Sequence, residues 1–70
     1  MINIEEIKVG NVIKCGTAKA IVTFIDGDEI CILHEWGETD ALKEEHFKFW
    51  DDTGVVIEEF KKILDEIKRI

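Results

Sequence analysis

Two cysteines and two histidines are the residues of this chain best suited to bind a soft metal ion: Cys15, Cys31, His34 and His46. Cys31 and His34 are separated by two residues, as the ligands of some zinc sites are. On an extended strand, however, residues three apart point to opposite faces. We therefore expect no metal site and no cofactor, and two free thiols.

The acidic sequence Asp26-Gly27-Asp28-Glu29 has ligand types that suit calcium. A calcium loop of the EF-hand type needs twelve residues that end in Glu, with a helix on each side. The sequence around Asp26 has neither feature, so we interpret these residues as a turn.

Residues for nucleophilic catalysis are scarce. The chain has no serine, and both cysteines fall in predicted strands without a base that the sequence places beside them. The five glycines lie singly at predicted element boundaries, without the spacing of a phosphate-binding loop. We therefore expect a protein that is not an enzyme.

An excess of acidic residues is the first feature that points to a function. Sixteen Asp and Glu against nine Lys and Arg give a net charge of −7, which disfavours direct nucleic-acid binding. Such charge keeps a small protein soluble, but it also complements a basic partner surface. The acidic residues assigned to this surface are Asp26, Asp28, Glu29, Glu35, Glu38 and Asp40.

The second feature is the aromatic segment Phe47-Lys48-Phe49-Trp50. Strand alternation would send Phe47 and Phe49 to one face and Lys48 and Trp50 to the other, so that one pair joins the core. Exposed Trp and Phe side chains act as anchors in protein interfaces. We therefore predict that Trp36 and Trp50 form the rim of the acidic surface.

Length and composition indicate one small folded domain, residues 1–70. The 70 residues are 46% hydrophobic, which is too apolar for a disordered tail. Apolar runs are far shorter than the roughly 20 residues of a membrane-spanning helix. The first residues, Met1–Ile7, contain Glu5 and Glu6 and no basic residue, unlike a signal peptide. We expect a cytoplasmic protein that does not bind membranes.

The body of the domain, Lys8–Trp50, has the pattern of an antiparallel sheet. Ala18–Ile25 and Glu29–Trp36 are joined by Asp26–Asp28, which is a strong hairpin signal. Shorter strands are predicted at Val12–Cys15, Asp40–Leu42 and Phe47–Trp50, with single helical turns at Asn3–Ile7 and Lys43–His46. With a three-residue hairpin loop, one face of the sheet holds Val22, Phe24, Ile30, Ile32, His34 and Trp36.

The C-terminal segment, residues 54–70, is predicted to be an amphipathic helix over Val55–Arg69, capped by Asp52 or Thr53. Acids in its first turn and bases in its last match the helix dipole. The helix is expected to cover the sheet, or alternatively to join two subunits in a homodimer. Its apolar stripe consists of Ile57, Phe60, Ile63, Leu64, Ile67 and Ile70.

Three segments resemble Src-homology-3-like small β-barrels of the Tudor and KOW kind: Ile7–Ile13, Ile21–Ile30 and Trp36–Leu42. The resemblance implies a five-stranded barrel or a strongly curled sheet. It also implies an aromatic pocket for a modified residue, with Trp36, Phe47 and Phe49 as candidates. Small barrels of this kind are common in phage and mobile-element proteins, which implies a role against host defence.

These observations predict an α+β domain in which a small five-stranded antiparallel barrel or curled sheet carries a C-terminal amphipathic helix. The predicted function is a protein-binding module that docks a basic, nucleic-acid-binding surface of a host defence protein as an inhibitor. Two alternatives remain open: binding of a small ligand or modified residue in an aromatic pocket, and assembly through the C-terminal helix.

Overall fold

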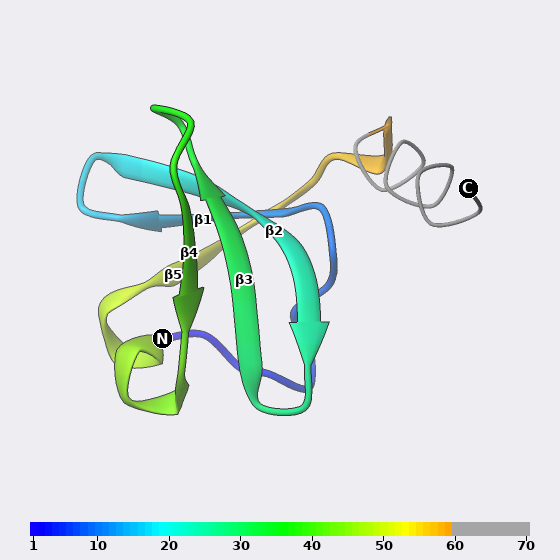
Figure 1. Cartoon of the computed structure of the whole chain (residues 1–70), viewed down its shortest axis with the longest axis vertical. Coiled ribbons are helices and arrows are strands. Elements are labelled where there is room, and N and C mark those ends of the chain that lie inside the picture. Colours follow the sequence, from blue (N-terminus) through cyan, green and yellow to red (C-terminus); the bar gives the residue numbers. More distant parts are fainter. Residues whose placement is uncertain (60–70) are drawn as a thin grey trace.

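A computed structural model describes residues 1–59 of the chain, and these residues are mostly β structure (Figure 1). Five antiparallel strands form one open sheet in the order β4-β3-β2-β1-β5. A short 3-10 helix, η1, connects β4 to β5. The elements are β1 Asn11–Cys15, β2 Ala18–Asp26, β3 Glu29–His34, β4 Thr39–Leu42, η1 Glu44–Phe49 and β5 Asp51–Val56.

The four strands predicted first along the chain are confirmed to within two residues at each end. The connection between β2 and β3 is shorter than predicted. Asp26 pairs with Glu29, so the loop consists of Gly27 and Asp28 alone, and Ile25 lies opposite Ile30. Gly27 has a φ of 60°, which a two-residue hairpin turn requires.

A β-bulge at Thr23 in β2 determines which side chains face the core. Phe24 pairs with Cys31, but the next pair toward the start of β2 is Val22 with Ile32, so Thr23 is an extra residue. The Thr23 hydroxyl donates a hydrogen bond to the Cys31 carbonyl oxygen at 3.1 Å. The prediction that Val22 and Phe24 share a face is therefore wrong, since Val22 is buried and Phe24 is 44% exposed.

One face of the sheet packs against the N-terminal turn and η1, and we call it the core face. Its largest fully buried side chains are Ile13, Val22, Ile30 and Ile32. Aliphatic burial of this kind is the main favourable contribution to folding in so small a chain. The remaining buried apolar residues are Ile2, Ile7, Ala20, Leu42, Phe47 and Trp50.

The predicted strand Phe47–Trp50 is wrong, because η1 occupies Glu44–Phe49. In a 3-10 helix residues three apart lie on the same side, so Phe47 and Trp50 are both buried. Lys48 and Phe49 face solvent instead. The two residues that strand alternation would separate are thus the two that join the core.

The predicted start of the C-terminal helix is also wrong, because β5 extends to Val56. Asp52 and Thr53 are not helix caps: the Asn11 side-chain amide donates to Asp52 Oδ1 at 2.8 Å, and the Thr53 hydroxyl donates to the Val12 carbonyl oxygen at 2.6 Å. Helical backbone begins at Glu58, and the predicted helix beyond residue 59 lies outside the described residues. The described residues are therefore mostly β rather than α+β.

The predicted N-terminal turn is confirmed. The amides of Glu6 and Ile7 both donate to the Asn3 carbonyl oxygen at 3.0 Å, and the Asn3 side chain accepts from the Glu5 amide at 3.1 Å. The Ile2 amide donates to the Phe47 carbonyl oxygen at 3.1 Å, so the turn is tied to η1.

Gly10 is the point at which β1, β2 and the end of β5 meet. Its amide donates to the Val22 carbonyl oxygen, and its own carbonyl oxygen accepts from the Ile57 amide, both at 2.8 Å. Gly10 has a φ of 93°, and a Cβ atom there would lie 2.9 Å from the Ile57 carbonyl oxygen. Only glycine therefore fits this position without movement of the backbone.

We predict that Gly10→Ala lowers the free energy of unfolding by about 2–4 kcal/mol. Alanine is strained in the left-handed backbone conformation of residue 10, and its Cβ atom would lie too close to the Ile57 carbonyl oxygen. The matched control is Gly27→Ala, where a Cβ atom meets nothing within 4 Å; its cost is about 1 kcal/mol from the backbone alone. Urea denaturation of both variants measures the difference. Equal losses would show that the Gly10–Ile57 contact is unimportant.

The bulge gives a second prediction. Thr23→Val keeps the side-chain shape but removes the donor to Cys31, so the free energy of unfolding should fall by about 1 kcal/mol. Thr39→Val, on the exposed edge strand β4, should change it by less than about 0.5 kcal/mol. Thermal denaturation followed by circular dichroism compares the two, and a Thr23 variant as stable as the wild type would contradict the role of this hydrogen bond.

Candidate functional site

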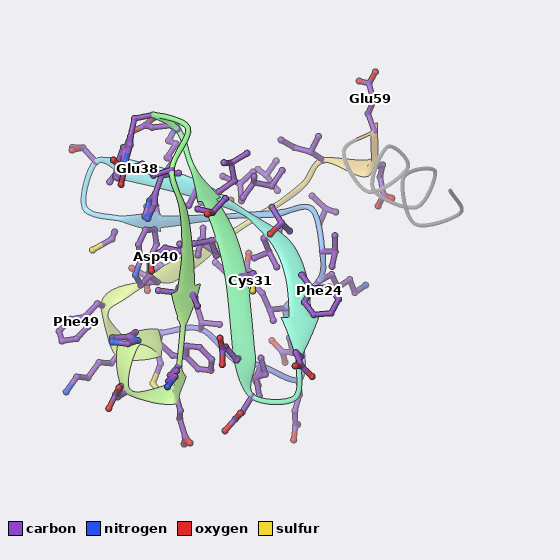
Figure 2. The ribbon with its side chains drawn as sticks, viewed as in Figure 1. Phe24, Cys31, Glu38, Asp40, Phe49 and Glu59 are labelled. Carbon is purple, nitrogen blue, oxygen red and sulfur yellow. The ribbon has the colours of Figure 1, made fainter. Side chains whose placement is uncertain are left out.

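The acidic residues assigned to one surface fall into two groups, one at the β2–β3 turn and one around the β3–β4 connection. Asp26, Asp28 and Glu29 lie at the β2–β3 turn, which we call the hairpin tip. Glu38 and Asp40 belong to the connection from β3 to β4 and to β4 itself, as Figure 2 shows for these two residues. At about 3.3 Å per residue along the strand, Asp40, which pairs with Ile32, is roughly 10 Å from the tip, and Glu35, beyond the end of β3, is roughly 20 Å from it. The two groups do not form one continuous patch.

The exposed indole of Trp36 stacks on the imidazole of His34. The ring centroids are 4.3 Å apart and the planes differ by 7°. Trp36 is 57% exposed, whereas His34 is only 9% exposed and has the Trp50 ring 5.9 Å away. Strand alternation predicts that His34 and Trp36 lie on the same side; the two rings are in contact, although Trp36 belongs to the turn after β3. One face of the Trp36 ring is thus supported from the core and the other is open.

Backbone hydrogen bonds position the loop that carries Trp36. The His34 amide donates to the Glu38 carbonyl oxygen at 2.7 Å, and the Gly37 amide donates to the His34 carbonyl oxygen at 2.9 Å. The Glu35 amide donates to the Lys19 carbonyl oxygen of β2 at 3.2 Å. These bonds close a tight turn around Trp36, so that the indole is presented from a fixed backbone.

Asp40 lies beside this aromatic stack. Its Oδ1 accepts from the Ala41 amide at 2.8 Å, and its Oδ2 is 3.5 Å from Nε2 of His34. The amide bond, with a smaller contribution from the His34 hydrogen bond, lowers the pKa of Asp40 below its ordinary value. The carboxylate is therefore ionised at neutral pH, beside the imidazole on which Trp36 stacks.

His34 also has the one buried side-chain nitrogen without a hydrogen-bond partner among residues 1–59, its Nδ1. With a proton on Nε2, the ring donates toward Asp40 and leaves Nδ1 as an unused acceptor on the core side. A buried unpaired acceptor destabilises the fold. The position that stacks His34 on Trp36 therefore leaves a buried nitrogen unpaired, which lowers the stability of the fold.

Trp50 does not form part of the rim of the surface, contrary to the prediction. It is 9% exposed and belongs to the core, where it supports His34. The exposed aromatic residue of this segment is Phe49, at 59%, with Nζ of Lys48 5.1 Å from its ring centre. Of the eight predicted partner-binding residues, the structure brings together Glu35, Trp36, Glu38 and Asp40.

The hairpin tip has both acidic and basic neighbours in the fold. Asp28 and Glu29 line a shallow surface hollow with Glu44 and Glu45, but Lys43 and Lys48 line it too. These lysines come from η1 and the residue before it, which the sequence does not place near the tip. The negative charge of the tip is therefore partly offset by neighbouring lysines.

The potential metal ligands are dispersed. No group of three or more His, Cys, Asp or Glu side chains in the described part of the chain is arranged to hold a metal ion. Cys15 is exposed at the end of β1, and the half-buried Cys31 points away from the core face that holds His34. Both thiols are free.

Among residues 1–59, no helix has the length and apolar character needed to cross a membrane. Comparisons with protein-family models, with curated proteins and with solved structures return no match for this chain. Its function must therefore be argued from the arrangement of its own residues.

The surroundings of Asp40 predict its titration. In a ¹³C NMR titration Asp40 should ionise below the ordinary aspartate range, and His34→Gln should reduce this depression without abolishing it, because the Ala41 amide bond remains. Since the folded-state pKa is depressed, the ionised carboxylate favours folding above the unfolded-state pKa. This contribution is lost as the pH falls through the folded-state pKa.

Asp51 is the control for this titration. Its pKa is lowered by the N-terminal ammonium of Met1, which lies 2.6 Å from Oδ1. His34→Gln should leave the titration of Asp51 unchanged. If Asp40 in the wild type ionised in the ordinary range, the hydrogen bond to the Ala41 amide would not be formed in solution.

Proposed function

We propose that this chain is a non-catalytic protein-binding module whose contact surface is centred on Trp36, with Glu35, Glu38 and Asp40 around it. We call these four residues the Trp36 surface. The observation that carries the proposal is the exposure of an indole that is held rigidly on a buried imidazole. A large aromatic side chain in a fixed position loses little entropy on binding, and Trp is enriched among the anchors of protein interfaces.

The charge around Trp36 defines the partner. Glu35, Glu38 and the ionised Asp40 are all exposed, and the chain as a whole carries a charge of −7. A basic surface complements this arrangement, and charge complementarity mainly accelerates association and selects the partner. The partner in this proposal is therefore a protein with a lysine- and arginine-rich surface.

The hairpin tip has a supporting role in this proposal. A contact area of about 800 Å² on each partner, if roughly circular, is about 30 Å across and reaches from Trp36 to the tip. Rim charges influence the association rate more than the dissociation rate. We assign Asp26, Asp28 and Glu29 to electrostatic steering and Trp36 to the lifetime of the complex.

In its most specific form, the proposal is that a phage or mobile element uses this domain in the cytoplasm to inhibit a host defence protein by covering its nucleic-acid-binding surface. Net charge and small size support this form, since such a surface is basic. The five antiparallel strands and the bulged β2 support the relationship to Src-homology-3-like small barrels on which the phage origin rests.

The alternative of an aromatic pocket for a modified residue has less support. Such a pocket needs several exposed aromatic walls, but His34 covers one face of Trp36 and Trp50 is in the core. Phe47, another candidate for a wall, is buried as well. A single open indole face suits a protein surface better than an enclosed small ligand.

The test starts with affinity capture from a bacterial lysate, followed by titration calorimetry with the purified partner. Trp36→Ala should weaken binding by about 30-fold or more, as truncation of an interface anchor does. Phe49→Ala is the matched control, because Phe49 is exposed to the same extent and lies outside the proposed surface. Its affinity should equal that of the wild type.

Charge reversal distinguishes the two acidic groups. Reversal of Asp26, Asp28 and Glu29 to lysine should mainly slow association, with an effect that declines as salt rises. Trp36→Ala should mainly accelerate dissociation. If affinity is insensitive both to salt and to Trp36→Ala, the proposed surface is wrong.

A further inference from the structure

The sheet has two edge strands, β4 and β5, and the edge formed by β5 is poorly suited to accept a further strand. Its pairing with β1 shifts register along the strand, as a bulge does. Its own side chains also bind two of its amides: the Gly54 amide donates to Asp52 Oδ1 at 2.8 Å, and the Val55 amide donates to Thr53 Oγ1 at 3.2 Å. Bulges and occupied amides protect a sheet edge from strand addition.

The edge formed by β4, the outermost strand beside β3 (Figure 1), is regular. Its residues pair with β3 without a register shift. The His34 amide donates to the Glu38 carbonyl oxygen just before β4, and hydrogen-bonded positions alternate along an antiparallel pair. Thr39 and Ala41 therefore direct their amide and carbonyl groups away from β3.

The outward amide of Ala41 is bound by an exposed side chain of its own strand. It donates to Asp40 Oδ1 at 2.8 Å, and the Asp40 side chain is 59% exposed. Thr39, Asp40 and Ala41 are all exposed, and β4 has no neighbouring strand on this side among residues 1–59. The β4 edge is thus accessible, and the carboxylate can leave the amide without a change in the core.

We propose that the partner of the Trp36 surface presents an extended segment, rich in lysine or arginine, that adds to the β4 edge as a further strand. This inference rests on the function proposed above, because it states how the same surface holds its partner. A carbonyl oxygen of the segment accepts from the Ala41 amide, and the released Asp40 carboxylate pairs with a basic side chain. In strand addition, main-chain hydrogen bonds give affinity and side chains give specificity.

The charges at this edge select a basic segment over a second copy of the chain. Glu38 lies directly before β4 and Asp40 lies within it, and both are exposed. Pairing between two β4 edges would bring the Asp40 carboxylates of two chains together, each chain with a charge of −7. Like charges across a strand pair are destabilising, whereas opposite charges are favourable.

The short length of β4 explains why the segment also needs Trp36. Only Thr39 and Ala41 offer outward main-chain groups, and each main-chain hydrogen bond contributes modestly in water. Trp36 lies in the connection that leads into β4. A segment that pairs along β4 therefore ends next to this connection, where the exposed indole provides the anchor.

The first test is amide hydrogen exchange in the unaltered full-length chain, measured by NMR with a defined probe. The probe is an acetylated and amidated octapeptide of alternating lysine and valine. At saturation it should slow exchange of the Thr39 and Ala41 amides by about tenfold or more. The Asp40 amide, which faces β3, is the internal reference.

The matched control for the probe is the same octapeptide with every amide methylated. It keeps the charge and the side chains, but its methyl groups prevent close approach of the two backbones, so it should not slow exchange. If neither peptide protects Thr39 and Ala41, or if both protect them equally, strand addition at β4 is wrong.

The second test compares variants in binding to the partner captured by the wild type. Ala41→Pro removes the outward amide, and proline is tolerated on an edge strand where its nitrogen faces away from the sheet. It should weaken binding by about tenfold or more. Ala41→Val keeps the amide and should bind as the wild type does.

This comparison separates the two proposals. If Trp36→Ala weakens binding and Ala41→Pro does not, the partner uses the Trp36 surface without adding a strand, and only the present inference is overturned. If binding is insensitive to both Trp36→Ala and salt, the proposed function is wrong, and this inference is overturned with it.

Discussion

The β-bulge at Thr23, an extra residue in β2, is the constraint on which the rest of the structure depends. The two-residue turn at Gly27 and Asp28 sets Ile25 opposite Ile30 on the core face. Uninterrupted alternation would then turn Thr23 and Ile21 toward the core and Val22 away from it. The bulge restores Val22 to the core, opposite Ile32, and the Thr23 hydroxyl stabilises it through the Cys31 carbonyl group.

Both surfaces of the sheet follow from this shift. On the core face, the register continues from Val22 and Ile32 to Ala20 and His34, which places the imidazole under Trp36 and against Trp50. On the opposite face of the sheet, the same shift aligns Ile21 with Leu33 and Val12, which line an apolar groove that we call the outer groove. One local irregularity thus positions the exposed indole on one side and an apolar surface on the other.

The two surfaces suit different kinds of contact. Trp36 is an exposed aromatic ring in a connection that also contains the exposed carboxylates Glu35 and Glu38, and a polar surface with one apolar anchor is typical of a reversible protein interface. The outer groove is lined mainly by aliphatic side chains, with a lysine, a histidine and a glutamate among the other lining residues. A predominantly aliphatic surface is stabilised when other apolar groups cover it.

The sequence by itself determined the strands β1 to β4, the N-terminal turn and the hairpin at Gly27, because alternation and turn residues act locally. It also determined that His34 and Trp36 lie together, since they are two residues apart. Only the tertiary structure decided the bulge at Thr23, the burial of Trp50 through η1, and β5 in place of a helix start. Each of these depends on pairing or packing with distant residues: Cys31, the core, and Asn11 of β1. Local pattern contains no information about such partners.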